Sequence, residues 1–471
     1  MNPAILLIFA ILANRPAKKE SPMARELKRM KFGSINWDVP SVGKDIKKIE
    51  TKSGTTLYLK ENHSLPLIEI TIYTKGGPAY LENGQRLPCN LIANTLIKAG
   101  TKTFSPDELV DSLECNAIKV TSESYDEYFV FSIQFQPEFA PLAMKLMREM
   151  LFEPRFDETV VNTEKLRVAD EWQRDMDIPQ RLLSEISRTI IFKGHPLGIR
   201  ENLETFDTLS RNFLVELHRK FFQPQNMVVS VVGDFSFESF SEDLINVFND
   251  KYNTGLILNA QKALPLEERK VYFCQRPIPQ GYVYFLQDAP SGYFDDIYKV
   301  LLMTDILGGG FNSKIVSKVR NELGLAYETY AYISFMSIVK GVFYAFSATR
   351  ADAVVNAIYY LEDAIKKMEN GEISQDELTF SKDSFLSSSV TAIRSDWGYV
   401  KRLALRSLFG FPDDYFEKMR NEIGKLNIED IREASRRYLN HEKMSIVVVG
   451  DSSKIDMEKL SDFGTIEFIE Y

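Results

Sequence analysis

The strongest constraint on the fold of this chain is a repeat within its own sequence. The stretch RKFFQPQNMVVSVVGD, at positions 219–234, aligns without a gap on RRYLNHEKMSIVVVGD, at positions 436–451. A second match pairs YFVFS at 128–132 with FYAFS at 343–347, and its offset is nearly the same. Because both offsets are as long as a whole domain, the sequence predicts a duplicated domain and not a short stacked repeat.

Each half alternates between strand-like and helix-like apolar patterns. Apolar runs with a period of 2 predict strands, and stretches with a period near 3.6, some opened by a capping box, predict helices between them. We therefore expect an α+β fold of two homologous α/β domains, each a mixed or antiparallel sheet with helices packed on one side. The strand candidates are residues 67–74, 128–134, 228–232, 271–274, 281–286, 341–347 and 445–449.

The boundaries of these domains follow from the least periodic part of the chain. Residues 256–270, LILNAQKALPLEERK, lack a clear apolar period and are the predicted linker. The first domain is then expected at residues 36–255 and the second at residues 271–471. A signal-like or anchor segment with its own linker is expected at residues 1–35.

The N-terminus carries the only targeting signal that the sequence suggests. Residues 3–13, PAILLIFAILA, form an apolar run that is too short to span a bilayer but suits the core of a signal peptide. The run predicts export to a periplasmic or envelope-associated location, with membrane attachment through these residues. No basic residue precedes the run, and a true start at Met23 would instead leave the chain cytoplasmic.

Composition narrows the classes of ligand. The chain of 471 residues is 44% hydrophobic, which is enough for two cores. Its formal net charge of -9 and the lack of a dense basic stripe argue against nucleic acid as a partner and leave a neutral or cationic peptide as a suitable ligand. Cys89, Cys115 and Cys274 lack the spacing of metal ligands, so we expect three reduced core residues.

Residues 307–330, LGGGFNSKIVSKVRNELGLAYETY, contain the candidate catalytic residues. The glycines at 308–310 are expected to end one helix, and Gly324 is expected to end the next. Arg320 would then lie in the last turn of that helix and Tyr327 in the following strand, so that a guanidinium and a phenol converge as donors to a carbonyl or an oxyanion. The alternative is an arginine placed favourably at a helix C-terminus, followed by a core tyrosine.

This segment resembles the insulinase and pitrilysin family of zinc metallopeptidases, the inverzincins. In that family the arginine and tyrosine of R-x-x-x-G-L-A-Y contact the substrate backbone near the metal. The resemblance covers most of the chain, residues 62–451, and implies a metallopeptidase-like fold in which Arg320 and Tyr327 act on the substrate. The motif falls on Arg320, Gly324, Leu325, Ala326 and Tyr327.

The sequence departs from the family at the zinc site. An active member carries H-x-x-E-H on a helix of its first half, which supplies two histidine ligands and a glutamate base. Here the motif falls on residues 91–95, LIANT, or on residues 90–94, NLIAN, and neither supplies a ligand pair. Glu171, far downstream of Thr95 in the segment VADEW, occupies the place of a third ligand and cannot hold zinc alone. We therefore expect no metal and no cofactor in this chain.

The lost motif implies a partner. In this family two such double domains face one another, with zinc on one and the arginine and tyrosine on the other, in one chain or in two. The resemblance therefore implies a heterodimer in which a catalytic zinc-peptidase subunit of the same family supplies the zinc, and a chain that is inactive alone. A proteolytically inactive scaffold with the same fold and an enzyme with a rebuilt site are the alternatives.

An edge strand is the second candidate contact with a peptide substrate. Members of the family align an extended substrate on an edge strand, and residues 118–122, IKVTS, follow a capped helix where that strand is expected. The alternative is an ordinary edge strand on which a lysine guards against aggregation. The candidate substrate-binding residues are Ile118, Lys119, Val120, Thr121 and Ser122.

Overall fold

The computed structural model describes residues 39–249, 255–266, 268–393 and 395–471. The predicted signal-like segment, residues 1–35, including its apolar run and Met23, lies outside these ranges. Within the described ranges, no helix is both long enough and apolar enough to cross a membrane.

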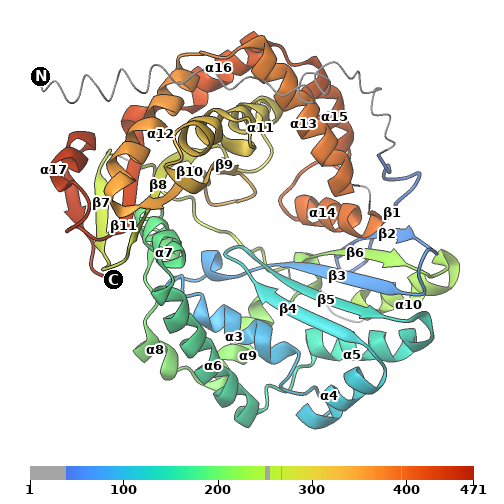
Figure 1. Ribbon diagram of the computed structural model, residues 1–471. Coiled ribbons are helices and arrows are strands. Elements are labelled where there is room, and N and C mark those ends of the chain that lie inside the picture. Colours follow the sequence, from blue (N-terminus) through green and yellow to red (C-terminus); the bar gives the residue numbers. More distant parts are fainter. Residues whose placement is uncertain (1–38, 250–254, 267, 394) are drawn as a thin grey trace, which may run out of the picture. The chain divides into compact units, whose positions relative to one another are not determined.

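The first half of the chain forms a six-stranded mixed sheet with the strand order β1-β2-β6-β3-β5-β4 (Figure 1). Strands β2 and β6 pair in parallel, and all other neighbours in this sheet are antiparallel. The strands are β1 (Lys47–Glu50), β2 (Thr56–Glu61), β3 (Ile68–Lys75), β4 (Lys119–Ser124), β5 (Tyr128–Phe135) and β6 (Met227–Gly233). The helices are α3 (Leu87–Leu96), α4 (Pro106–Cys115), α5 (Ala140–Phe152), α6 (Glu158–Asp177), α7 (Pro179–Ile191), α8 (Leu203–Asp207), α9 (Arg211–Phe221) and α10 (Phe237–Asn249).

The second half forms another six-stranded mixed sheet, with the strand order β12-β7-β11-β8-β10-β9. The strands are β7 (Val271–Gln275), β8 (Gln280–Ala289), β9 (Ala326–Ser334), β10 (Gly341–Arg350), β11 (Ser445–Gly450) and β12 (Ile466–Phe468). The helices are α11 (Ile297–Thr304), a first π-helix (Asp305–Gly309), a second π-helix (Val316–Glu322), α12 (Val354–Glu369), α13 (Gln375–Ile393), α14 (Asp396–Leu408), α15 (Tyr415–Lys425), α16 (Ile428–Tyr438) and α17 (Met457–Leu460).

The two sheets share one topology, which confirms the predicted duplication and the α+β class. From β2 to β4 the first sheet has the same strand order as the second sheet from β7 to β9. Helices α7 and α14 are separated at both ends by the same offset as the sequence repeat, and so are α9 and α16. Residues 256–266 and 268–270, within the predicted linker, contain no helix or strand. The domain boundaries themselves stay predictions.

A helix from each half packs on the sheet of the other half. Helix α14 packs on β2, β3 and β6, whereas α7 packs on β8 and β11. Because side chains alternate along a strand, Leu57 and Leu59 enter the first core while Tyr58 between them faces the other way. The Tyr58 hydroxyl donates to Asp413, just after α14, at 2.6 Å. The expectation of helices on one side only was therefore incomplete.

Reciprocal packing explains why the central strands are buried along their whole length. Every residue of β6 and of β11 is buried, and both strands are continuous apolar runs with few polar residues. Cys89 and Cys274 are also buried, but Cys115, the last residue of α4, is exposed. The prediction of three core cysteines is therefore wrong for Cys115.

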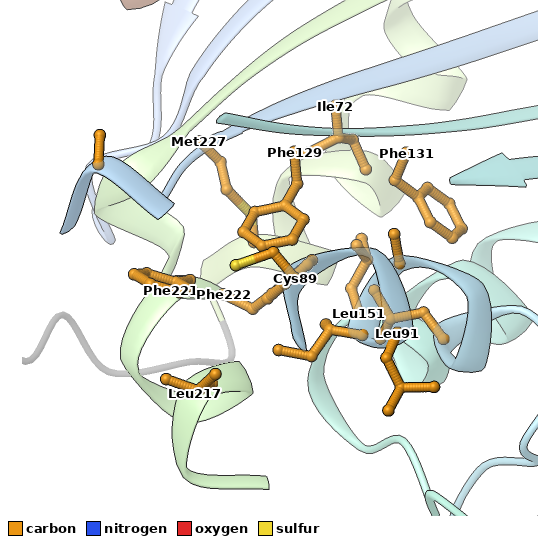
Figure 2. Close-up of a cluster of buried hydrophobic side chains, with 14 of the residues drawn as sticks. Ile72, Cys89, Leu91, Phe129, Phe131, Leu151, Leu217, Phe221, Phe222 and Met227 are labelled. Carbon is orange, nitrogen blue, oxygen red and sulfur yellow. The ribbon is translucent and has the colours of Figure 1, made fainter. Parts of the chain in front are cut away.

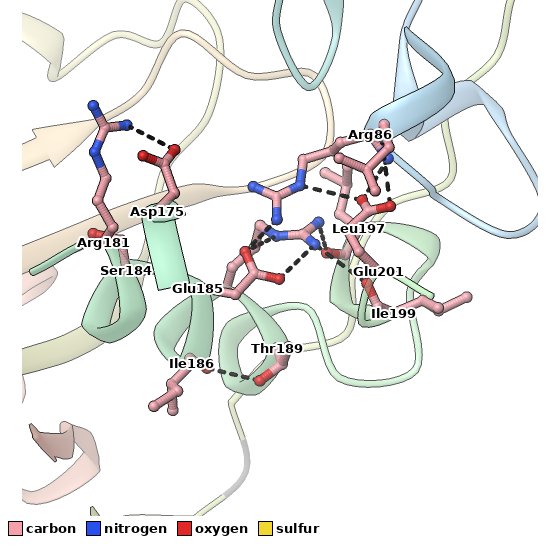
Figure 3. A network of polar contacts seen from close by, with 12 residues as sticks. Arg86, Asp175, Arg181, Ser184, Glu185, Ile186, Thr189, Leu197, Ile199 and Glu201 are labelled. Carbon is pink, nitrogen blue, oxygen red and sulfur yellow. Dashed lines mark hydrogen bonds and ion pairs between the residues drawn. The ribbon is translucent and has the colours of Figure 1, made fainter. Parts of the chain in front are cut away.

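A buried ionic network fixes α7 against the start of α3 (Figure 3). Glu185 on α7 pairs with Arg86 and, at 3.1 Å, with Arg188, while the Tyr471 hydroxyl donates to it at 3.0 Å. Burial alone would raise the pKa of Glu185, but the two guanidinium groups outweigh burial and hold that pKa below its usual value. Nearby Glu201 accepts from the Arg86 amide, yet burial dominates there and raises its pKa.

Candidate functional site

Two π-helices flank the glycine-rich loop that precedes Arg320. Helix α11 continues directly into the first π-helix, which contains Gly308 and Gly309, while Gly310 follows in extended conformation. The helix therefore ends within the glycine run, as predicted, and its last turn is a π-helix. Single π-turns are rare and occur frequently at functional sites.

Glycine is required at two positions here, for different reasons. A Cβ atom on Gly308 would lie 2.2 Å from the backbone nitrogen of Ala331, so only glycine lets the first π-helix approach strand β9 this closely. Gly324 has a φ of +63° and follows the second π-helix, as predicted. The Leu325 amide then donates to the Val319 carbonyl at 2.9 Å, which satisfies an acceptor at that helix end.

Arg320 contacts two exposed aromatic rings. Its guanidinium carbon is 4.7 Å from the centroid of the Tyr327 ring and 5.1 Å from that of the Phe311 ring. Tyr327 is 84% exposed and Phe311 is 68% exposed. The Asn321 side chain donates to the Phe311 carbonyl at 2.9 Å, which fixes the loop that carries this ring. The structure thus brings Arg320 and Tyr327 together, and Tyr327 is not a core residue.

The charge of Arg320 is not neutralised within the described part of the chain. No carboxylate of the described residues forms an ion pair with Arg320, and the nearby Glu322 pairs instead with Lys318 at 2.6 Å. A guanidinium offers five N–H donors in a fixed plane, and cation–π contact with the rings leaves its edges free to donate. The arrangement can therefore donate hydrogen bonds to a carbonyl or an oxyanion.

The predicted substrate strand is the outer strand of the first sheet. Strand β4 pairs with β5, and no other strand of the described chain pairs with it. Lys119 and Thr121 are exposed, whereas Val120 and Ser122 are half-buried. Ile118 precedes the strand, is buried, and its amide donates to the Leu113 carbonyl at 2.9 Å. Ile118 is therefore a core residue. The two groups of predicted site residues lie in different halves of the chain, because β4 belongs to the first sheet while Arg320 and Tyr327 lie on the second π-helix and on β9.

Residues 90–95 of α3, which align with the family's zinc motif, lie largely in the apolar core. Leu91 and Ile92 are fully buried, and the Thr95 hydroxyl donates to the Leu91 carbonyl at 2.6 Å. Figure 2 shows Leu91 and Cys89 among apolar side chains that include Phe129. No group of three or more His, Cys, Asp or Glu side chains in the described ranges could hold a metal ion. The residues of α3 therefore do not fit zinc.

The remaining candidate ligands each have a local partner. Glu171 is exposed and pairs with Arg167 on the same helix. The Nδ1 atom of His195 accepts from the Leu197 amide at 3.1 Å, so this residue is a turn histidine, as predicted. The other histidine contacts are His63 with Asp234, His218 with the Leu151 carbonyl, and His441 with Glu369.

Sequence reasoning missed Phe311 as the third member of the Arg320 cluster. The available signal was a phenylalanine placed directly after three glycines and before Asn312, in a loop where a large apolar side chain has no core to enter. The π-helices gave no such signal, because their buried residues are spaced almost as in an α-helix.

Comparison with known proteins gives the same family over both halves. Residues 90–200 match the family profile described as Insulinase (Peptidase family M16), and residues 208–385 match the profile described as Peptidase M16 inactive domain. The chain is 21% identical to "Uncharacterized zinc protease YmxG" of Bacillus subtilis, over 84% of this chain and 96% of that protein. It is 23% identical to "Non-peptidase homolog YmxG" of Helicobacter pylori, over 84% of this chain and 91% of that protein.

Solved structures agree with this fold. A peptidase M16 inactive domain from Pseudomonas fluorescens superimposes with a TM-score of 0.80 and 20% identity, over 86% of this chain and 98% of that one. A protease from Helicobacter pylori has a TM-score of 0.77 and 16% identity, over 88% of this chain and 100% of that one. Together with the two profile matches, these likenesses show that the chain belongs to the insulinase family, peptidase family M16.

Proposed function

We propose that this chain is the non-catalytic subunit of a heteromeric zinc metallopeptidase. A partner chain of the same family holds the zinc ion, and Arg320 and Tyr327 donate hydrogen bonds to the scissile carbonyl or to the oxyanion that forms from it. The apolar residues at the motif's place on α3 support this proposal, because they leave the chain without zinc ligands where the family has them.

The observation that carries the proposal is a half-buried arginine that contacts two aromatic rings and has no carboxylate partner among the described residues. Ordering a long side chain costs conformational entropy, about 1.5–2 kcal/mol for an arginine. An arginine that served only as a solvated charge would not need contact with two aromatic rings. Two exposed rings that orient a free guanidinium are instead what a site for an anionic or carbonyl group requires.

The open edge of β4 supports a peptide as the substrate. An extended peptide can add to this edge through backbone hydrogen bonds, which tolerate many sequences. Lys119, Val120, Thr121 and Ser122 lie on this strand and remain the proposed contacts. Ile118 is withdrawn as a direct contact, because its side chain is buried and its amide is already bonded.

A proteolytically inactive scaffold is the second candidate. It is favoured by the name of the Helicobacter pylori relative, which describes that protein as a non-peptidase homolog. A scaffold has no need of the Arg320 and Tyr327 arrangement, so the two candidates differ in what the assembled protein does with a peptide.

Affinity purification from the native cell, followed by metal analysis, tests the proposal. We expect the tagged chain to co-purify with a chain that carries H-x-x-E-H, and zinc to be present in the complex but absent from this chain after separation. Recovery only as a free monomer, or tightly held stoichiometric zinc in the isolated chain, would contradict the proposal. Cell fractionation in the same experiment tests the proposed periplasmic or envelope location.

A further inference from the structure

A cavity of about 470 Å³ lies between the segment after α5 and helix α9, and the proposed peptidase role does not use it. We call it the basic cavity, because four cationic side chains and one carboxylate line it. The charged lining residues are Lys102, Glu153, Arg155, Arg211 and Arg219. Such an excess of positive charge is unusual in a chain whose formal net charge is -9.

One of the arginines is fixed by the backbone. Arg211 donates from Nε to the Phe156 carbonyl at 2.8 Å and from Nη2 to the Arg155 carbonyl at 2.6 Å. Phe156 has a φ of +50°, and only one other non-glycine residue in the described ranges, Ala117, has a positive φ. Backbone strain of this kind, at a residue that is 1% exposed, is retained where the surrounding structure imposes it. It holds the two carbonyls and hence the Arg211 guanidinium in place.

Two other arginines form no ion pair with the part of the chain that the structure describes. Neither Arg155 nor Arg219 makes an ion pair or a side-chain hydrogen bond with another described residue. The single carboxylate of the lining is already engaged, because Glu153 lies 3.7 Å from Lys102 and 3.5 Å from Arg148. The positive potential of the cavity is therefore not neutralised by the described chain.

The lining also has an apolar, aromatic part. The rings of His218 and Phe222 stack with centroids 4.7 Å apart, and Phe156 meets His218 edge-on at 5.5 Å. All three residues line the cavity. A ligand with an organic body as well as a negative charge therefore matches this lining better than a small inorganic ion does.

We propose that the basic cavity binds a phosphate group carried on a small organic body. Arg155 and Arg219 pair with the phosphate oxygens, since the planar guanidinium fork matches phosphate geometry, and Arg211 supplies a fixed donor. The organic body lies against Phe152 and Val215, which also line the cavity and are only half-buried. A soluble phosphate monoester and the headgroup of an anionic phospholipid both carry a phosphate on a small organic body. Two binding experiments distinguish these ligands.

Calorimetric titration of the full chain with glycerol 3-phosphate at low, constant ionic strength tests the soluble source. Co-sedimentation with phosphatidylglycerol vesicles, compared with phosphatidylcholine vesicles, tests the lipid source. The Arg155→Ala/Arg219→Ala variant removes the two unpaired charges. The Arg181→Ala/Arg350→Ala variant is the control, since it removes two exposed arginines outside the cavity and changes the net charge equally. Circular dichroism checks that both variants fold.

We expect binding in at least one arm, with a Kd of about 0.1–1 mM for the monoester. The cavity variant should weaken that binding at least about tenfold, which corresponds to about 1.4 kcal/mol, while the control variant binds as the wild type does. Vesicle binding that depends on the cavity identifies a lipid headgroup, and monoester binding alone identifies a soluble ligand. No binding in either arm, or equal binding by all three proteins, would overturn the proposal.

Discussion

At the scale of single residues, burial and neighbours determine chemistry that residue type alone leaves open. Arg320 and Arg188 are both arginines near the ends of helices, yet Arg188 is buried against Glu185. Arg320 instead contacts exposed rings and forms no ion pair with a carboxylate of the described residues. The sequence predicted where Arg320 and Tyr327 lie along the chain, because glycine and strand patterns bracket them. It could not place Phe311 beside them, since loop conformation decides that contact.

His218 provides a pH-dependent test at this scale. Burial lowers the pKa of His218 from 6.5 to about 4, while its Nε2 atom contacts the Leu151 carbonyl at 3.0 Å. Between pH 6.5 and pH 4, His218 is therefore protonated in the unfolded chain but neutral in the folded chain. The contribution of this group to the free energy of unfolding is fully present above pH 6.5 and decreases as the pH falls through this range. Between pH 7 and pH 5 this group should cost about 2 kcal/mol of unfolding free energy.

Urea unfolding at pH 7 and pH 5, in a buffer without phosphate, measures this effect. His218→Gln keeps an N–H donor for the Leu151 carbonyl but does not titrate. The variant should lose about 2 kcal/mol less stability than the wild type on going to pH 5. Equal losses in the two proteins would show that His218 is protonated in the folded state.

At the scale of elements, apolar patterns of period 2 predicted most of the buried strands, and strands without such a pattern were missed. All seven strand candidates correspond to observed strands, with ends shifted by at most a few residues. Strands β1, β2 and β12 were missed. Strands β1 and β12 are short and largely exposed, and the buried residues of β2 are consecutive, so no alternation marks any of the three. The glycine run correctly predicted the end of a helix, but it did not reveal the close approach of Gly308 to Ala331, because glycine is compatible with both.

The close approach of the first π-helix to β9 gives a test with a matched control. Gly308→Ala places a methyl group 2.2 Å from the Ala331 nitrogen, so we expect a loss of about 1–3 kcal/mol in unfolding free energy. Gly310→Ala meets no atom within 4 Å and has an extended backbone, so its effect should stay within about 0.5 kcal/mol. Thermal or urea unfolding of both variants measures these two changes in unfolding free energy. Equal stability of the two would mean that β9 and the π-helix are not held in contact.

At the scale of the whole molecule, duplication was predictable and the exchange of helices between halves was not. The constant offset between matching segments revealed the repeat, but an amphipathic pattern does not specify which sheet a helix covers. Helices α7 and α14 each cover the other half's sheet, and this reciprocity buries both faces of β6 and β11. The identities of the proposed zinc-binding partner and of the peptide likewise cannot be predicted from this sequence, because their contacts involve a second chain.

The most direct test of the proposed function is the turnover of the reconstituted complex with a single hydroxyl removed. Tyr327→Phe keeps the ring that contacts Arg320, and Tyr332→Phe is the control because it removes a phenol from the same strand. With assembly and zinc content equal to wild type, Tyr327→Phe should lower kcat/KM by about ten- to a thousandfold, the range for a lost oxyanion donor. Tyr332→Phe should leave kcat/KM unchanged. A normally assembled Tyr327→Phe complex that cleaves peptide as fast as wild type would contradict the role assigned to this residue.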